Sequence, residues 1–194
     1  MSVVVYGSIN TDLIAYTPRL PRRGETLLGN SYMMALGGKG ANQAVAAARL
    51  DADVYMVGYV GDDTFGRRVL KQLSGYGVEV SRVNMIKDLG TGLAVINVDD
   101  NGENTIIVLS GANMHFDHKD VERTQDLFMD AKVLLLQLEV PVEADMAVAR
   151  AAHEQGIRVI LDPAPAAQLP EEMYRIADIM TPNEVETEMM VGIR

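Results

Sequence analysis

Two runs of consecutive apolar residues stand out in the first third of the chain. Residues 2–6 form a β-branched run that Gly7 closes, and residues 54–60 form a second run of the same kind. Runs of this length without regular polar alternation are typical of strands buried on both faces. We therefore predict two central strands of a sheet here.

Helical patterns accompany these strands. Residues 41–50 form an Ala-rich segment whose small side chains allow close packing on neighbouring backbone. Asp51 stands where glycine usually ends a helix, and Asp tolerates the left-handed conformation better than most residues. The side chains of Asp62 and Asp63 can cap a second helix, which we expect to extend to about residue 75.

Two segments predict short strands outside the main sheet. Residues 13–34 alternate between polar and apolar and are broken by Pro18, Pro21 and Gly24. Residues 93–98 and 105–109 flank an Asn-Gly pair, which is a strong hairpin signal between apolar runs. We expect these segments, near 13–34 and 90–109, to form a flap or lid.

The second half of the chain predicts alternating strands and helices. A helix is expected near residues 117–129, followed by strands at 133–136, 159–161 and, more weakly, 176–180. Pro141 suits the first helical position and Gly156 suits the position after a helix end. Repeated alternation predicts an α/β fold with a largely parallel sheet, and the absence of linkers or repeats indicates one domain over residues 1–194.

Composition narrows the class of protein. The chain has 194 residues, of which 48% are hydrophobic, and a formal net charge of −10, so its field repels nucleic acids and anionic membranes. It has no cysteine, which suits a reducing compartment. We found no signal-peptide pattern and no membrane span, and we expect a cytoplasmic protein.

The glycine-rich turn at residues 37–42 is the most informative stretch. Consecutive glycines let the backbone approach a ligand, and the following helix offers free N–H groups to it. The turn fails the Walker A pattern, because Met33 and Gly40 stand where glycine and Ser or Thr are needed, and it fails the dinucleotide fingerprint at Gln43. Lys39 and Asn42 favour polar hydroxyl groups as the ligand, whereas a tight turn without any ligand remains the alternative.

Polar residues also follow two of the predicted strands. Asn10 and Asp12 lie just beyond the first strand, at the sheet edge where α/β proteins bind ligands, and their spacing can turn both toward one crevice. Glu139 is a carboxylate in an apolar run just beyond another strand. The alternatives are an Asx turn at Asn10 and Asp12 and a solvent-exposed turn at Glu139.

Several of these stretches resemble the ribokinase family of carbohydrate kinases, also called the PfkB family. The glycine-rich turn through Ala44 and the segment 58–66 resemble its first signature, and residues 7–12, 162–165 and 181–186 follow in the family's order. The resemblance implies a ribokinase-like three-layer sandwich with a small β-strand lid. It also implies ATP-dependent phosphorylation of a sugar, with the conversion of ribose to ribose 5-phosphate as the leading reaction.

The resemblance assigns residues to two parts of a site. It implies sugar binding by Asn10, Asp12, Gly38, Lys39, Asn42 and Glu139. It implies a role beside ATP for Asn183 and Glu186, with Glu186 holding Mg²⁺ through water and K⁺ bound elsewhere in the full-length family member. On local pattern alone, Asn183 and Glu186 are a helix cap followed by a solvated acidic face.

The family's second signature, a Gly-Ala-Gly-Asp turn that carries the catalytic base, does not occur in this sequence. We expect that base beyond Arg194, and we assign no chemistry to His115 and His118. The alternatives are a truncated, non-catalytic sugar-binding module and a kinase for a nucleoside or a sugar phosphate. A truncated sheet would expose an edge and apolar surface, so we expect a homodimer or other self-association.

Overall fold

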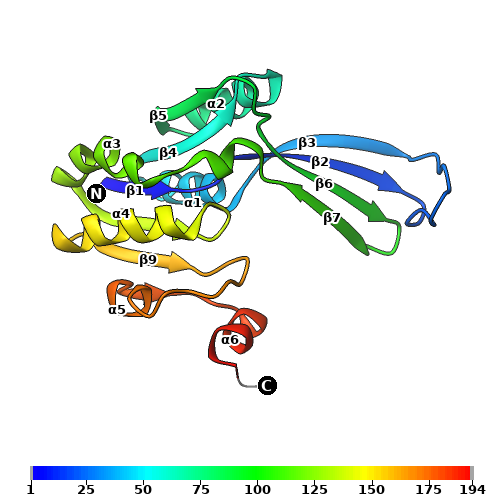
Figure 1. Cartoon of the computed structure of the whole chain (residues 1–194). Coiled ribbons are helices and arrows are strands. Elements are labelled where there is room, and N and C mark those ends of the chain that lie inside the picture. The colour runs from blue at the N-terminus through cyan, green and yellow to red at the C-terminus, as the bar shows by residue number, and fades with distance from the viewer. Residues whose placement is uncertain (1, 193–194) are drawn as a thin grey trace.

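The computed structural model describes residues 2–192, and a six-stranded sheet forms its centre (Figure 1). Every pair of neighbouring strands in this sheet is parallel. In spatial order the strands are β10 (Ile179–Met180), β9 (Arg158–Asp162), β8 (Ala131–Gln137), β1 (Ser2–Tyr6), β4 (Asp53–Gly61) and β5 (Val78–Ile86). The first strand of the chain therefore lies in the interior of the sheet, as its apolar run predicts.

Helices cover both faces of this sheet and give the molecule three layers (Figure 1). On one face, α1 (Lys39–Ala48) and α2 (Thr64–Gly75) pack in a core with Val3 and Val5 of β1. On the other face, α4 (Val142–Glu154) packs in a second core with Val4 and Tyr6. The alternate residues of β1 thus enter opposite cores, which explains why Val3, Val4 and Val5 are all apolar. The short helix α5 (Met173–Ile176) and then α6 (Glu184–Val191) follow toward the end of the chain.

A second sheet of four strands extends away from the first (Figure 1). Its order is β3 (Ser31–Gly37), β2 (Asn10–Thr17), β6 (Gly92–Asp99) and β7 (Asn104–Leu109). The central pair, β2 and β6, is parallel and both outer pairs are antiparallel. Only residues 7–9 separate β1 from β2, so the chain passes directly from one sheet into the other.

Several local predictions are confirmed. Asp63 caps α2, because its side chain accepts a 2.7 Å hydrogen bond from the Gly66 N–H. Asp51 has a φ of 61°, in the left-handed region that was expected after the first helix, and Gly156 has a φ of 72° after α4. The Asn-Gly hairpin joins β6 to β7. Pro141 stands one position earlier than expected, at the cap of α4.

Other predictions are wrong. β5 was not predicted, because it lies at the sheet edge and its apolar residues alternate with polar ones. The expected helix at 117–129 is three short turns, η2 (His118–Val121), α3 (Glu122–Gln125) and η3 (Asp126–Met129). A capping box between Asp117 and Asp120 begins the first of them, η2. His115 lies in a separate turn, η1 (Gly111–His115), and Ile176 belongs to α5 rather than to the last strand. No helix within residues 2–192 is long and apolar enough to cross a membrane.

One buried carboxyl group opposes this packing. Asp145 of α4 is fully buried, and neither of its carboxyl oxygens has a hydrogen-bond partner within residues 2–192. Burial raises its pKa well above the usual value, because an apolar environment disfavours the charged form. Nearby, burial and then the charges of Asp120 and Asp145 raise the pKa of Tyr6, whose hydroxyl also lacks a partner.

We predict that Asp145→Leu stabilises the chain by about 1–3 kcal/mol at pH 7, the usual cost of an unpaired buried polar group. The unfolded chain releases the Asp145 proton near pH 3.9, below the folded pKa, so the contribution of Asp145 to the stability of the wild type falls as pH rises above about 4. The difference between variant and wild type should therefore increase from pH 4 to pH 7 in urea denaturation. Glu143→Gln, on an exposed position of the same helix, is the control. A destabilised leucine variant would contradict this reading.

Candidate functional site

The amino end of α1 is held by side chains from distant parts of the chain. Glu139 follows β8, and its Oε2 accepts hydrogen bonds from the Lys39 N–H at 2.9 Å and from the Ser8 hydroxyl at 2.5 Å. The Ser8 hydroxyl oxygen in turn accepts the Gly40 N–H at 3.3 Å, and the Ser8 carbonyl accepts the Ala41 N–H at 2.9 Å. A carboxylate near a helix amino end is also favoured by the helix dipole.

This arrangement corrects one sequence expectation. The first N–H groups of α1 were expected to be free for a ligand, but Glu139 and Ser8 occupy them, because burial of this helix end requires partners for its N–H groups. The glycines are needed for the close approach of the backbones. Gly38 has a φ of 89°, and a Cβ there would lie 2.8 Å from the Asn10 nitrogen, while a Cβ on Gly40 would lie 2.7 Å from the Ser8 nitrogen.

A cavity of about 330 Å³ opens beside this helix end, at the carboxyl edge of the six-stranded sheet. It brings together three of the predicted site residues, Asn10, Lys39 and Glu139. Asn10 is only 3% exposed, so its side chain is fixed by its surroundings. The wall of the cavity combines polar and apolar side chains, as small-molecule sites usually do. It is completed by Val108, Ser110, Asn113, Met114, Leu138, Val140 and Pro165.

Asp12 lies next to this cavity without lining it. The residue is half-buried on β2, and its carboxyl group packs against Gly37, where a Cβ would lie 1.9 Å from Oδ1. Burial, and after it the negative charge of Glu139, raises the pKa of Asp12. The charge of Glu139 therefore acts on Asp12, which connects this residue to the same group of side chains.

Asp162 joins the group from the end of β9. Burial raises its pKa most, the positive charge of Lys39 lowers it, and the negative charges of Glu186 and Glu139 raise it again. From the sequence, Asp162 was recognised only as part of a motif, and no role was expected for Ser8 or Asn113. The position of Asp162 at a strand end, like that of Asn10, was the signal available for it.

Asn183 and Glu186 form a capping box at the start of α6. The Asn183 side chain accepts a 2.8 Å hydrogen bond from the Glu186 N–H, and the Glu186 carboxylate accepts one of 2.8 Å from the Asn183 N–H. Their contacts are therefore those of a helix cap, which the local sequence pattern by itself predicted. Glu186 is nevertheless close enough to Asp162 for its charge to raise the pKa of that group. Within residues 2–192, no group of three or more His, Cys, Asp or Glu side chains has a geometry that could hold a metal ion.

The structure places Asn42 away from the wall of the candidate-site cavity. Asn42 is exposed on α1 and lines a different cavity of about 450 Å³, together with Leu36 of β3 and Arg49.

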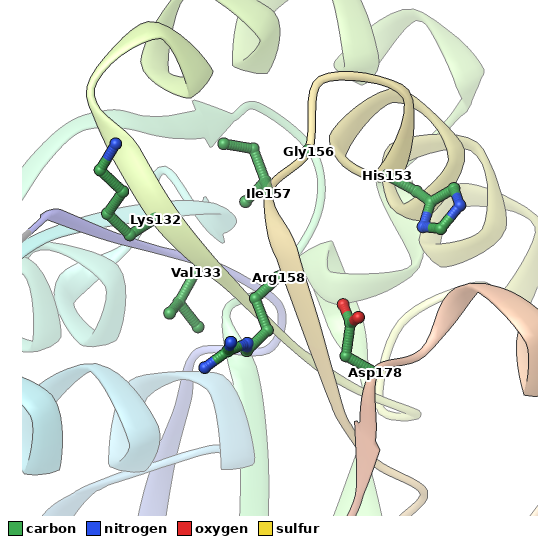
Figure 2. A pocket seen from close by; sticks show the side chains of 7 residues that line it. All are labelled: Lys132, Val133, His153, Gly156, Ile157, Arg158 and Asp178. Carbon is green, nitrogen blue, oxygen red and sulfur yellow. The ribbon is translucent and has the colours of Figure 1, made fainter.

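A further cavity of about 430 Å³ lies at the amino edge of the six-stranded sheet (Figure 2). Its cationic side chains, Lys132 and Arg158, point in different directions in Figure 2, so they do not converge on a common ligand.

Comparison with known proteins gives consistent matches. A family model described as pfkB family carbohydrate kinase matches residues 1–194. The ribokinase of Haemophilus influenzae is 39% identical over 192 residues, which cover 99% of this chain and 63% of that protein. The deoxyribokinase of Salmonella typhi is 37% identical over 194 residues, which cover all of this chain and 63% of that protein.

A solved structure, that of Arabidopsis thaliana ribokinase complexed with ribose and ATP, has a TM-score of 0.91 and 35% identity to this chain. The match covers 98% of this chain and 62% of the plant protein. The chain thus spans slightly less than two thirds of the length of each of these relatives.

We predict that Ser8→Ala destabilises the chain by about 1.5–3 kcal/mol, the range for hydrogen bonds to charged groups, because it removes the donor to Glu139 and the acceptor for Gly40. Urea denaturation measures the change. Ser110→Ala is the matched control, since Ser110 also lines the cavity but its hydroxyl does not cap η1. Equal effects of the two substitutions would contradict the role given to Ser8.

Proposed function

Because this chain belongs to the pfkB family of carbohydrate kinases, we propose that the whole protein transfers the γ-phosphoryl group of ATP to a hydroxyl of ribose. The ribokinase-like α/β fold is shared with solved ribokinases. The observation that carries the proposal is the convergence of Asn10, Lys39 and Glu139 on one cavity at the carboxyl edge of the sheet.

The polar groups of the cavity, together with the carboxyl group of Asp12 outside its wall, suit a polyol. Carboxylate oxygens of Glu139 and Asp12 accept hydrogen bonds from sugar hydroxyls, and Lys39 and the Asn10 amide donate them. A site built on such bonds discriminates strongly against molecules that lack the matching hydroxyl, because its buried groups are then left unpaired. The relatives carry the names ribokinase and deoxyribokinase, so both sugars are candidates. Gly38 has no side chain, so its backbone could come close to the sugar. Asn42 is proposed as a sugar contact only on the family resemblance.

Charge favours a neutral sugar over the alternative of a sugar phosphate. Among residues 2–192, Lys39 is the only cationic residue in the wall of the cavity, which Glu139 also lines. The nearby carboxyl groups of Asp12 and Asp162 already have raised pKa values, in part through the charge of Glu139. A second anion bound here would meet the same repulsion, so an uncharged sugar fits better.

We propose that Glu186 takes part in binding Mg²⁺ with ATP through the water shell of the ion. Mg²⁺ keeps several waters and uses only one or two carboxylates in such sites, which suits a region with no group of three ligands among residues 2–192. The ion would neutralise charge on the phosphates during transfer. Asn183 would remain a helix cap that orients Glu186, and the catalytic base and a K⁺ site would lie outside this sequence.

The four-stranded sheet is proposed to act as a lid over the sugar, excluding water that would otherwise hydrolyse ATP. Val108 of β7 already contributes to the wall of the cavity. The face of the four-stranded sheet that carries Val108 also carries a row of apolar side chains across all four strands. Neighbouring members of this row are directly opposite one another in the strand register. They are Met33, Ile14, Ile96 and Ile106.

We propose that a second copy of the chain covers this row and forms a homodimer. Met33 is 45% exposed and Ile106 is 54% exposed, so the row ends in large apolar surfaces. All residues of β7, which is one of the two edge strands, are exposed as well. Apolar rows and open strand edges of this kind favour association.

For the sugar site we predict that ribose binds to the wild-type chain in calorimetric titration and that Asp12→Ala weakens binding at least about tenfold, or about 1.4 kcal/mol. The variant should be no less stable in thermal unfolding, because it removes a carboxylate that is repelled by Glu139. Glu143→Gln, on the exposed face of α4, is the control. Absence of ribose binding by the wild type would overturn the proposal.

A second titration with ATP and Mg²⁺, followed by an assay for ADP, separates catalysis from binding. We expect ribose binding without ADP formation by this chain, because the family's catalytic turn is absent from its sequence. That result would mean that residues 1–194 by themselves act as a non-catalytic sugar-binding module. Ribose-dependent ADP formation would contradict the expected place of the base.

For the dimer we predict that Ile106→Lys converts the chain to a monomer in size-exclusion chromatography with light scattering, because a charge would be buried in the contact. Ile107→Lys is the matched control, since its side chain leaves β7 on the opposite face. A wild-type monomer at micromolar concentration, or equal effects of both substitutions, would count against this interface.

A further inference from the structure

Asn113 is a buried polar residue that the sugar site does not yet explain. It lies in η1, directly after the four-stranded sheet, and is 1% exposed. Its Oδ1 accepts a 2.9 Å hydrogen bond from the Ile9 N–H. Its Nδ2 donates to the Oδ1 of Asn10 at 2.6 Å and to the Ile9 carbonyl at 3.3 Å. Asn113 therefore touches the residue that joins the two sheets and the side chain that faces the cavity.

These contacts fix the orientation of the Asn113 amide, and the Asn113 amide then fixes the orientation of the Asn10 amide. The Ile9 N–H can only donate, so the atom of Asn113 that faces it must be the oxygen. The other end of the Asn113 amide is then the NH₂ group, which can only donate, so the atom of Asn10 that faces it must also be the oxygen. The orientation of Asn10 thus follows from a backbone donor and not from the side chain itself.

The two amides are also packed closely against the backbone of Gly92. A Cβ on Gly92 would lie 2.0 Å from the Oδ1 of Asn10 and 2.4 Å from the Nδ2 of Asn113. Both residues also line the cavity of the candidate site. Because the Asn10 oxygen is bound to Asn113 and packed against Gly92, the NH₂ group is the end of the Asn10 amide that we expect to face a ligand.

We propose that Asn113 is a positioning residue that holds the Asn10 amide with its NH₂ group directed to the sugar. At this point the site then requires a ligand oxygen that accepts a hydrogen bond. The inference rests on the proposed function, because it specifies the polarity of one contact in that sugar site. It also connects the lid to the site, since η1 follows β7 directly.

The first test is Asn113→Asp, which has nearly the same shape. The Asp side chain still accepts the Ile9 N–H, but it presents a second acceptor to Asn10. Asn10 must then turn its NH₂ group toward residue 113 and its oxygen toward the sugar. We expect ribose affinity in calorimetric titration to fall about tenfold, or about 1.4 kcal/mol. Unchanged affinity would overturn the proposal.

A double-mutant cycle separates positioning from general damage. If Asn113 acts through Asn10, ribose affinity should be the same for Asn10→Ala and for the double variant Asn10→Ala with Asn113→Asp. Additive losses would show that Asn113 acts independently and would overturn the proposal. Thr124→Val is the control for loss of a buried polar group, because Thr124 is fully buried and its hydroxyl donates to the Asp120 carbonyl, away from the cavity.

Two further measurements keep the test decisive. If Asn113→Asp does not fold, Asn113→Ala replaces it, with a smaller expected loss of ribose affinity that again disappears in the Asn10→Ala background. If the wild type binds no ribose, the proposed function fails, and NMR then tests the positioning contact by itself. A coupling across the hydrogen bond from Asn113 Nδ2 to Asn10 Cγ is expected in the wild type, and its absence would overturn the inference.

Discussion

The site depends on one carboxylate oxygen that joins three separate segments. Oε2 of Glu139, beyond β8, accepts the Ser8 hydroxyl from the β1–β2 connection and the Lys39 N–H from α1. A buried helix end with unpaired N–H groups would be unstable, so this contact secures the helix and the two strand ends together. Because one oxygen of Glu139 is used in this way, only the other remains for a ligand, and its position is set by the fold.

Acidic side chains gather around this anchor at an electrostatic cost. Asp12 and Asp162 have raised pKa values because of burial and, in part, because of Glu139. Lys39 opposes the repulsion by favouring the charged form of Asp162. Groups that are kept in an unfavourable environment at the edge of a sheet are typical of binding sites, since a ligand that donates hydrogen bonds relieves the cost. A neutral polyol provides such donors without adding negative charge.

Sequence reasoning succeeded where a property is local and failed where it is not. The apolar run of β1 and the cap at Asp63 depend on neighbouring residues, and both were predicted correctly. The edge strand β5 was missed because exposure of one side gives it a mixed pattern. The region 117–129 has helical composition, but its capping box at Asp117 and the turns that follow divide it.

By itself the sequence determined the alternation of strands and helices, the hairpin and the strand-end positions of Asn10 and Glu139, because each follows from periodicity and turn residues within a few positions. Only the tertiary structure decided which polar groups are available to a ligand. Ser8 meets Glu139 across 131 positions, and Asn113 meets Asn10 across 103. Contacts over such separations leave no periodic trace in the chain, because they depend on how the two sheets are joined and not on the residues beside them.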